Sequence, residues 1–254
     1  MPMLQQMKDI ESRFQSASGL VDRRHYKIYY SRIHPFPILV LGYNPGGASD
    51  GTDLSASASF FENWEHDYPC FRNHPRYPLA APMCELLSKT LGITSVNELR
   101  QIPATNVIFR RSRDMKRLNS KRDAIAETAR FLAEIIRLVQ PTAILFISKT
   151  AYDIFLRSYC ERGSITKLAK PQYTPNGRGQ ACIYQASKGF VRSLSRPTEL
   201  LMVGHPSKYA RRAAEWQNVT NLLGARLRDL GLCPLSDTGH LAPLADLPGY
   251  GEIV

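Results

Sequence analysis

The chain lacks the features that mark several large classes of protein. No apolar run reaches the roughly 18 to 20 residues of a membrane-spanning helix, and the N-terminus carries no apolar signal core. The five cysteines are scattered and form no C-x-x-C pair, which argues against a zinc or iron–sulfur site and for reduced thiols. We therefore expect a cytoplasmic protein with no membrane contact, no metal and no other cofactor.

Three enzyme motifs are absent as well. The sequence has no G-x-x-x-x-G-K-[ST] loop and no G-x-G-x-x-G turn, which weighs against a nucleotide-binding enzyme. It has no G-x-S-x-G elbow, which weighs against a serine hydrolase. Acidic residues are scarce, since 22 Asp and Glu stand against 33 Lys and Arg and leave a net charge of +11. That surplus points to a polyanionic partner, with nucleic acid ahead of a membrane surface.

Two apolar runs that end in glycine and proline organise the sequence. Residues 37–47 read P-I-L-V-L-G-Y-N-P-G-G, and residues 200–207 read L-L-M-V-G-H-P-S. A short unbroken aliphatic run is typical of a strand buried on both faces of a parallel sheet. Open α/β sheets bind ligands at the carboxyl ends of such strands, so Asn44 and His205 are placed where a site is expected.

The pair G-Y-N-P-G-G and G-H-P-S, in this order, resembles the two signature motifs of the uracil-DNA glycosylase superfamily. The first motif matches the G-x-N-P-G form of the mismatch-specific and single-strand-selective branches. The resemblance covers roughly residues 36 to 230. It implies a single α/β/α sandwich around a short, mainly parallel sheet, and a monofunctional enzyme that removes a base from DNA and leaves an abasic site.

The alternation of apolar and helical patterns predicts the same α/β fold class. One domain is expected over residues 1–254, with an N-terminal helical segment at 1–35, a core at 36–230 and an irregular tail at 231–254. Residues 162–180 are expected to be loop, and 181–186 a strand that forms a hairpin with 190–194. The remaining predicted strands are 38–41, 105–109, 143–147 and 200–203, and the predicted helices are 3–16, 80–91, 122–139, 150–157 and 208–230.

The resemblance implies roles for the residues of the two motifs. Asn44 would orient the attacking water, and His205 would stabilise the departing base. The carboxylate that the fast branch of the superfamily carries at the position of Asn44 is absent, so we expect a slow enzyme. Asn106 would read the edge of the base, and Tyr43 and Gly46 would line its pocket. Each of three residues could instead have a structural role. Asn44 could cap its own turn, and His205 could cap the helix that follows it. Asn106 could be a buried side chain that hydrogen-bonds backbone groups.

Aromatic and basic residues complete the predicted site. Phe60 or Phe61 would stack on the flipped base, and Lys208 and Tyr209 follow H-P-S where relatives insert a wedge into the duplex. The other predicted DNA-binding residues are Arg110, Arg111, Arg113, Ser207, Arg211 and Arg212.

The identity of the base is predicted from one position. The uracil-restricted branch has a tyrosine that excludes C5 groups where this chain has Gly46, so we expect activity on a C5-modified pyrimidine. Hypermodified bases of bacteriophage DNA are one source, which would make the protein an antiviral defence enzyme. The alternatives are a plain uracil or mismatch repair glycosylase and a catalytically idle nucleic-acid-binding protein. The partner is expected to be single- or double-stranded DNA, and the protein a monomer.

Overall fold

A computed structural model describes residues 3–22, 25–45, 80–93, 98, 101–111, 121–176, 179–209 and 212–232. Within this part of the chain, seven strands form one sheet in the order β2-β1-β3-β7-β6-β4, and β5 also pairs with β6. The sheet is parallel from β2 to β7 and antiparallel from β7 onward.

The parallel half contains the four strands that the apolar runs predict. They are β1 (Ile38–Gly42), β2 (Ala104–Asn106), β3 (Ala143–Phe146) and β7 (Pro197–Val203). Every residue of β1, β2 and β3 is buried, as expected for strands covered on both faces. Strand β2 is shorter than predicted, because regular pairing with β1 ends where Gly42 lies opposite Asn106.

The antiparallel half corrects the prediction from sequence. It contains β4 (Thr166–Lys167), β5 (Gln172–Asn176) and β6 (Gly179–Phe190). The expected loop at 162–180 therefore holds two strands, and the hairpin partner of β6 is β5 instead of residues 190–194. Strand β6 runs on to Phe190 because β7 pairs with it from Tyr184 to Phe190. Pro175 is tolerated in β5 because β5 is an edge strand.

The helices fall close to their predicted positions, with one correction. They are α1 (Met3–Ser18), α4 (Ala80–Leu91), α6 (Lys121–Val139), α7 (Lys149–Tyr159), α8 (Pro206–Tyr209) and α9 (Ala213–Asp229). The single helix expected at 208–230 is two helices, because Arg212 takes a non-helical conformation with φ −100° and ψ 82°. No helix in the described residues is both long and apolar enough to cross a membrane.

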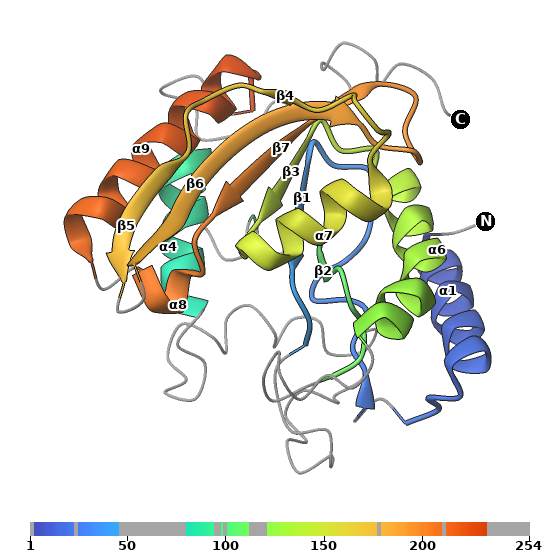
Figure 1. Ribbon diagram of the computed structural model, residues 1–254. Helices are drawn as coiled ribbons and strands as arrows, with labels where there is room; N and C mark the ends of the chain where they lie inside the picture. The colour runs from blue at the N-terminus through green and yellow to red at the C-terminus, as the bar shows by residue number, and fades with distance from the viewer. Residues whose placement is uncertain are drawn as a thin grey trace.

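Helices cover both faces of the sheet, as Figure 1 shows with α7 in front and α4 and α9 behind. Hydrogen bonds from β6 place two of them. The hydroxyl groups of Ser187 and Tyr152 of α7 lie 2.7 Å apart, whereas the Tyr184 hydroxyl donates to the Leu222 carbonyl of α9 at 3.5 Å. Since Tyr184 and Ser187 are an odd number of residues apart, they point to opposite faces. The architecture is thus the α/β/α sandwich that the sequence predicts.

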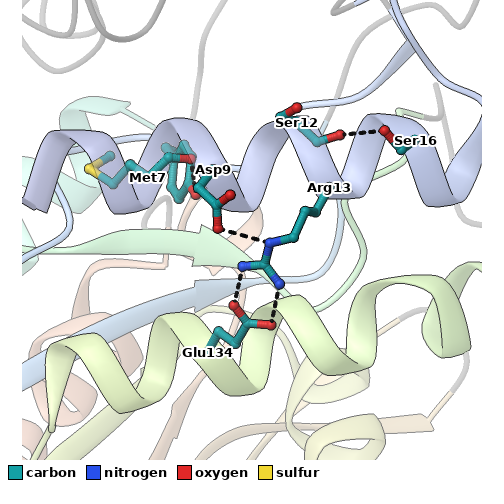
Figure 2. Close-up of polar contacts among 7 residues, drawn as sticks. Met7, Asp9, Ser12, Arg13, Ser16 and Glu134 are labelled. Atoms are coloured by element: carbon teal, nitrogen blue, oxygen red, sulfur yellow. Dashed lines mark hydrogen bonds and ion pairs between the residues drawn. The ribbon is translucent and has the colours of Figure 1, made fainter. Parts of the chain in front are cut away.

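The N-terminal helix packs against α6. Arg13 reaches across the two helices and donates to both carboxylate oxygens of Glu134, at 3.0 and 2.5 Å, and to Asp9 at 2.9 Å (Figure 2). Phe14, the next residue of α1, is fully buried against the ring of Phe131. The apolar face that the sequence predicts for residues 3–16 therefore packs against the core.

The segment after α1 covers the free edge of β2. The amide of Lys27 donates to the Phe109 carbonyl at 2.9 Å, and the amide of Tyr30 donates to the Ala104 carbonyl at 3.0 Å. An uncovered edge strand exposes unpaired backbone groups, and this segment satisfies them. It also holds in place the strand that ends at Asn106.

Candidate active site

Three of the predicted polar residues lie at one edge of the sheet. Asn44 follows β1, Asn106 ends β2, and His205 follows β7 after Gly204. Because these strands are parallel, their carboxyl ends share an edge, which in Figure 1 is the side of the sheet where α8 lies. The structure therefore brings the two motifs and Asn106 to the edge where α/β sheets bind ligands.

Asn106 is held in a space that a glycine leaves. It lies opposite Gly42 in the register of β1 and β2, and its side chain is only 4% exposed. A Cβ atom on Gly42 would stand 2.1 Å from its Oδ1 atom, so only glycine fits beside this amide. Its Nδ2 atom is buried and has no hydrogen-bond partner among the residues that the structure describes. A buried donor without a partner costs about 1–3 kcal/mol, so Nδ2 is a donor available to a ligand.

Tyr43 and Asn44 continue from β1 into the turn. Tyr43 is 8% exposed, its hydroxyl has no hydrogen-bond partner within the described part of the chain, and burial raises the pKa of that hydroxyl. Its carbonyl accepts from the amide of Ile108 at 3.0 Å, which carries the pairing with the β2 segment past the end of β1. The half-buried Asn44 side chain donates from Nδ2 to the Pro45 carbonyl at 3.0 Å. That bond fixes the plane of the Asn44 amide.

His205 is half-buried at the start of α8. Burial lowers the pKa of its imidazole, and the nearby charge of Lys208 lowers it further, so the ring is neutral at pH 7. Its carbonyl accepts from the amides of Lys208 and Tyr209 at 2.9 and 3.3 Å, which starts the helix directly after the strand. The H-P-S turn therefore presents an imidazole that carries one N–H donor.

Gly204 allows the chain to turn tightly before His205. Its amide donates to the Ile183 carbonyl of β6 at 2.7 Å. A Cβ atom on Gly204 would lie 2.6 Å from the ring of Tyr209, so this ring packs directly on the glycine. Tyr209, one of the two residues predicted at the wedge position, thus supports the turn that carries His205, and its role toward DNA stays a prediction.

The sequence predicted a strand at 143–147 and a helix at 150–157, but it did not predict that they lie between the two motifs. Strand β3 separates β1 from β7, so the first turn of α7 stands between Asn44 and His205 along the edge. Ser148 caps this helix and accepts from the amide of Ala151 at 3.4 Å. The signal is the Ser148 cap directly after the apolar run that ends at Ile147.

Some of the predicted DNA-binding residues are paired or buried within the protein, and others are exposed. Arg110 donates to both carboxylate oxygens of Glu127, at 2.6 and 2.5 Å, and Arg111 is only 7% exposed. Arg212 donates to the Thr174 hydroxyl at 2.7 Å and to a backbone carbonyl of the same strand. Lys208 is exposed at the end of α8, and Ser207 lies within that helix. Contact of these side chains with DNA stays a prediction.

Five predicted site residues lie outside the described residues, and their roles remain predictions. They are Gly46, Phe60, Phe61, Arg113 and Arg211.

Comparison with known proteins gives two results. No curated protein matches the chain. The family model described as Uracil DNA glycosylase superfamily matches residues 31–230, a span that contains all four parallel strands and both motifs. The chain therefore belongs to the uracil DNA glycosylase superfamily, a family of DNA glycosylases.

Proposed function

We propose that this chain is a monofunctional DNA glycosylase that hydrolyses the N-glycosidic bond of a flipped-out pyrimidine carrying a C5 substituent. The observation that supports it best is the buried Nδ2 donor of Asn106, which no described residue satisfies and which lies at the edge that also carries Asn44 and His205. Membership of a DNA glycosylase superfamily supports the same reaction class.

The attacking group is a water molecule that Asn44 orients. In the reaction, the bond between C1′ and the base nitrogen breaks, its electron pair leaves with the base, and the water oxygen bonds to C1′ and releases one proton to solvent. The departing base anion takes up a proton from solvent. An amide is too weak a base to deprotonate this water, so Asn44 contributes position alone. The bond from Nδ2 to the Pro45 carbonyl supports this role because it fixes the amide plane.

His205 and Asn106 act on the base. The charge that leaves with the base collects on its carbonyl oxygen, and the neutral imidazole of His205 donates one hydrogen bond there. Its lowered pKa supports this assignment, because a ring that stays neutral at pH 7 has one donor and carries no net charge. Asn106 donates from Nδ2 to an acceptor on the base edge, which suits either uracil or cytosine.

The C5 substituent is proposed from Gly46 and the small residues that follow it, Gly47 and Ala48. A glycine at this position leaves no side chain to exclude a group at C5. Large C5 groups occur on hypermodified bases of bacteriophage DNA, so the proposed biological role is antiviral defence.

The experiment is a base-release assay on a set of matched oligonucleotides. Purified protein is incubated with DNA containing uracil, thymine, 5-hydroxymethylcytosine or glucosylated 5-hydroxymethylcytosine at one position, and abasic sites are counted after alkaline cleavage. We expect release of a C5-modified base. Gly46→Tyr should abolish that release while any activity on plain uracil survives, so uracil serves as the internal control.

The outcomes separate the alternatives. Release of uracil alone would identify a repair glycosylase and overturn the C5 proposal. Binding of DNA without release of any base would identify an idle binding protein. Equal loss of both activities in Gly46→Tyr would show that the residue does not select at C5.

A further inference from the structure

The β4–β6 ribbon, residues 166–190, carries basic side chains and no acidic ones. It lies within residues 162–198, a stretch that contains no Asp or Glu. The same stretch carries seven basic residues: Arg162, Lys167, Lys170, Arg178, Lys188, Arg192 and Arg196. Lys167 and Lys170 are exposed along the outer edge of the sheet, on the chain that leads into β5. With no carboxylate in the stretch to offset them, these lysines form a cationic edge.

The ribbon extends past the end of the parallel strands. Val203, the last residue of β7, lies opposite Tyr184 of β6, and β6 begins five residues earlier at Gly179. Because β6 runs antiparallel to β7, residues 179–183 and their partner β5 continue beyond the carboxyl edge by roughly 16 Å. The described part of the hairpin therefore extends past the edge where His205 lies.

Tyr173 is an exposed aromatic side chain on this extension. It is 55% exposed and lies opposite Cys182 in the register of β5 and β6. Thr174, the next residue of β5, points to the α9 face, because its hydroxyl contacts Glu215 of α9 and Arg212, and Tyr173 therefore points to the opposite face. Tyr173 thus faces the same side of the sheet as α7, whose first turn stands between the two motifs.

The hairpin is fixed to the chain that follows His205. The guanidinium of Arg212 donates to the Thr174 hydroxyl at 2.7 Å and to the Pro175 carbonyl, and it stands directly before α9. The Gly204 amide bonds the Ile183 carbonyl on the neighbouring strand. Since β5 is two strands from β7, the Tyr173 backbone lies roughly 10 Å to the side of the H-P-S turn.

We infer that Lys167, Lys170 and Tyr173 of the β4–β6 ribbon form a second DNA-binding surface, which holds single-stranded DNA beside the flipped nucleotide. Tyr173 stacks on an unpaired base of that strand, and Lys167 and Lys170 contact its phosphates. Arg212, predicted from sequence to bind phosphate, is a positioning residue that keeps the hairpin beside His205. This inference rests on the proposed function for the identity of its ligand, DNA.

Phe190 provides the matched control. It is also an exposed aromatic residue, 40% exposed, but it ends β6 at the amino edge of the sheet, at the far end from the site. Affinity for an unmodified single-stranded oligonucleotide is measured for Tyr173→Ala, Tyr173→Phe and Phe190→Ala in the full chain. Stacking of one base on an aromatic ring accounts for about 1–3 kcal/mol, so Tyr173→Ala should weaken binding about 5- to 150-fold. Tyr173→Phe and Phe190→Ala should bind as the wild type does.

Two further measurements separate stacking from charge. In a fully paired duplex no base face is free, so Tyr173→Ala should leave its affinity almost unchanged. Lys167→Gln with Lys170→Gln should weaken binding of both DNAs and reduce the salt slope on single strands by roughly 0.7 per lysine. A Tyr173→Trp variant should lose the added tryptophan emission when single-stranded DNA binds, whereas Phe190→Trp should keep it.

Several results would overturn the inference. One is an equal effect of Tyr173→Ala and Phe190→Ala, and another is an effect of Tyr173→Ala on RNA alone. If the wild type releases a base but is insensitive to Tyr173→Ala, the second surface is refuted and the glycosylase assignment stands. If DNA binding depends on Tyr173 but no base is released from any DNA, the glycosylase assignment fails and the DNA-binding surface stands.

Discussion

Gly42→Ala is a test of whether Asn106 reads the base. The added Cβ atom would lie 2.1 Å from Oδ1 and 3.3 Å from Cγ of Asn106. A carbon–oxygen contact is ordinarily about 3.3 Å, so the amide must move by about 1 Å. Gly42 does not have a positive φ, so alanine brings no backbone strain and the effect is confined to this contact. The substitution therefore displaces the Asn106 side chain without removing it.

The expected loss follows from what Asn106 supplies. A misplacement of 1 Å, or the loss of one aimed donor, typically slows catalysis by about 10²- to 10³-fold. We expect a loss of this size in single-turnover base release, while non-specific DNA affinity is retained. If the effect acts through Asn106, Gly42→Ala combined with Asn106→Ala should be no slower than Asn106→Ala alone.

Gly224→Ala is the matched control, because it adds the same methyl group inside α9. The nearest atom to its Cβ would be Nη1 of Arg228 at 3.5 Å, an ordinary contact. Replacing a mid-helix glycine with alanine should raise the free energy of unfolding by about 0.5–1 kcal/mol and leave base release unchanged. Wild-type activity in Gly42→Ala would refute the assignment of Asn106, and an equal loss in both variants would show a general effect of added volume.

The remaining predictions concern the two motifs and the surface charge. Asn44→Ala and His205→Ala should each slow base release by about 10²- to 10³-fold with DNA affinity nearly intact, and a wild-type single-turnover rate in either would contradict its role. DNA affinity should fall steeply from about 50 to 200 mM salt, because the basic side chains release cations bound to the phosphates and this release is less favourable at higher salt. A flat dependence would count against a nucleic-acid substrate. Lys208→Gln should raise the pKa of His205 but leave it below its usual value, since burial is the larger cause; an NMR titration measures this. Because that folded-state pKa lies below the unfolded value of about 6.5, stability should fall as the pH drops below 6.5, and His205→Gln should reduce this fall.

The predictions from sequence succeeded where burial on both faces determines the structure. The apolar runs at 38–41 and 143–147 became β1 and β3 because a strand covered on both faces requires apolar residues throughout. The prediction failed at β5, where the chain reads Q-Y-T-P-N and one side of the strand faces solvent. An edge strand needs only half of its residues buried and tolerates proline, so its sequence looks like a loop.

The same contrast explains how much of the site could be predicted. Asn44 and His205 each follow a buried strand directly, so local pattern was enough to place both at the carboxyl edge. The position of Asn106 beside Gly42 depends on the register of β1 against β2, which no periodicity within one strand encodes. In the motif G-Y-N-P-G-G the first glycine reads locally as part of a turn, yet it is the last residue of β1. Its missing side chain leaves the space that Asn106 fills, so the proposed base-reading role of Asn106 depends on this glycine as much as on the amide.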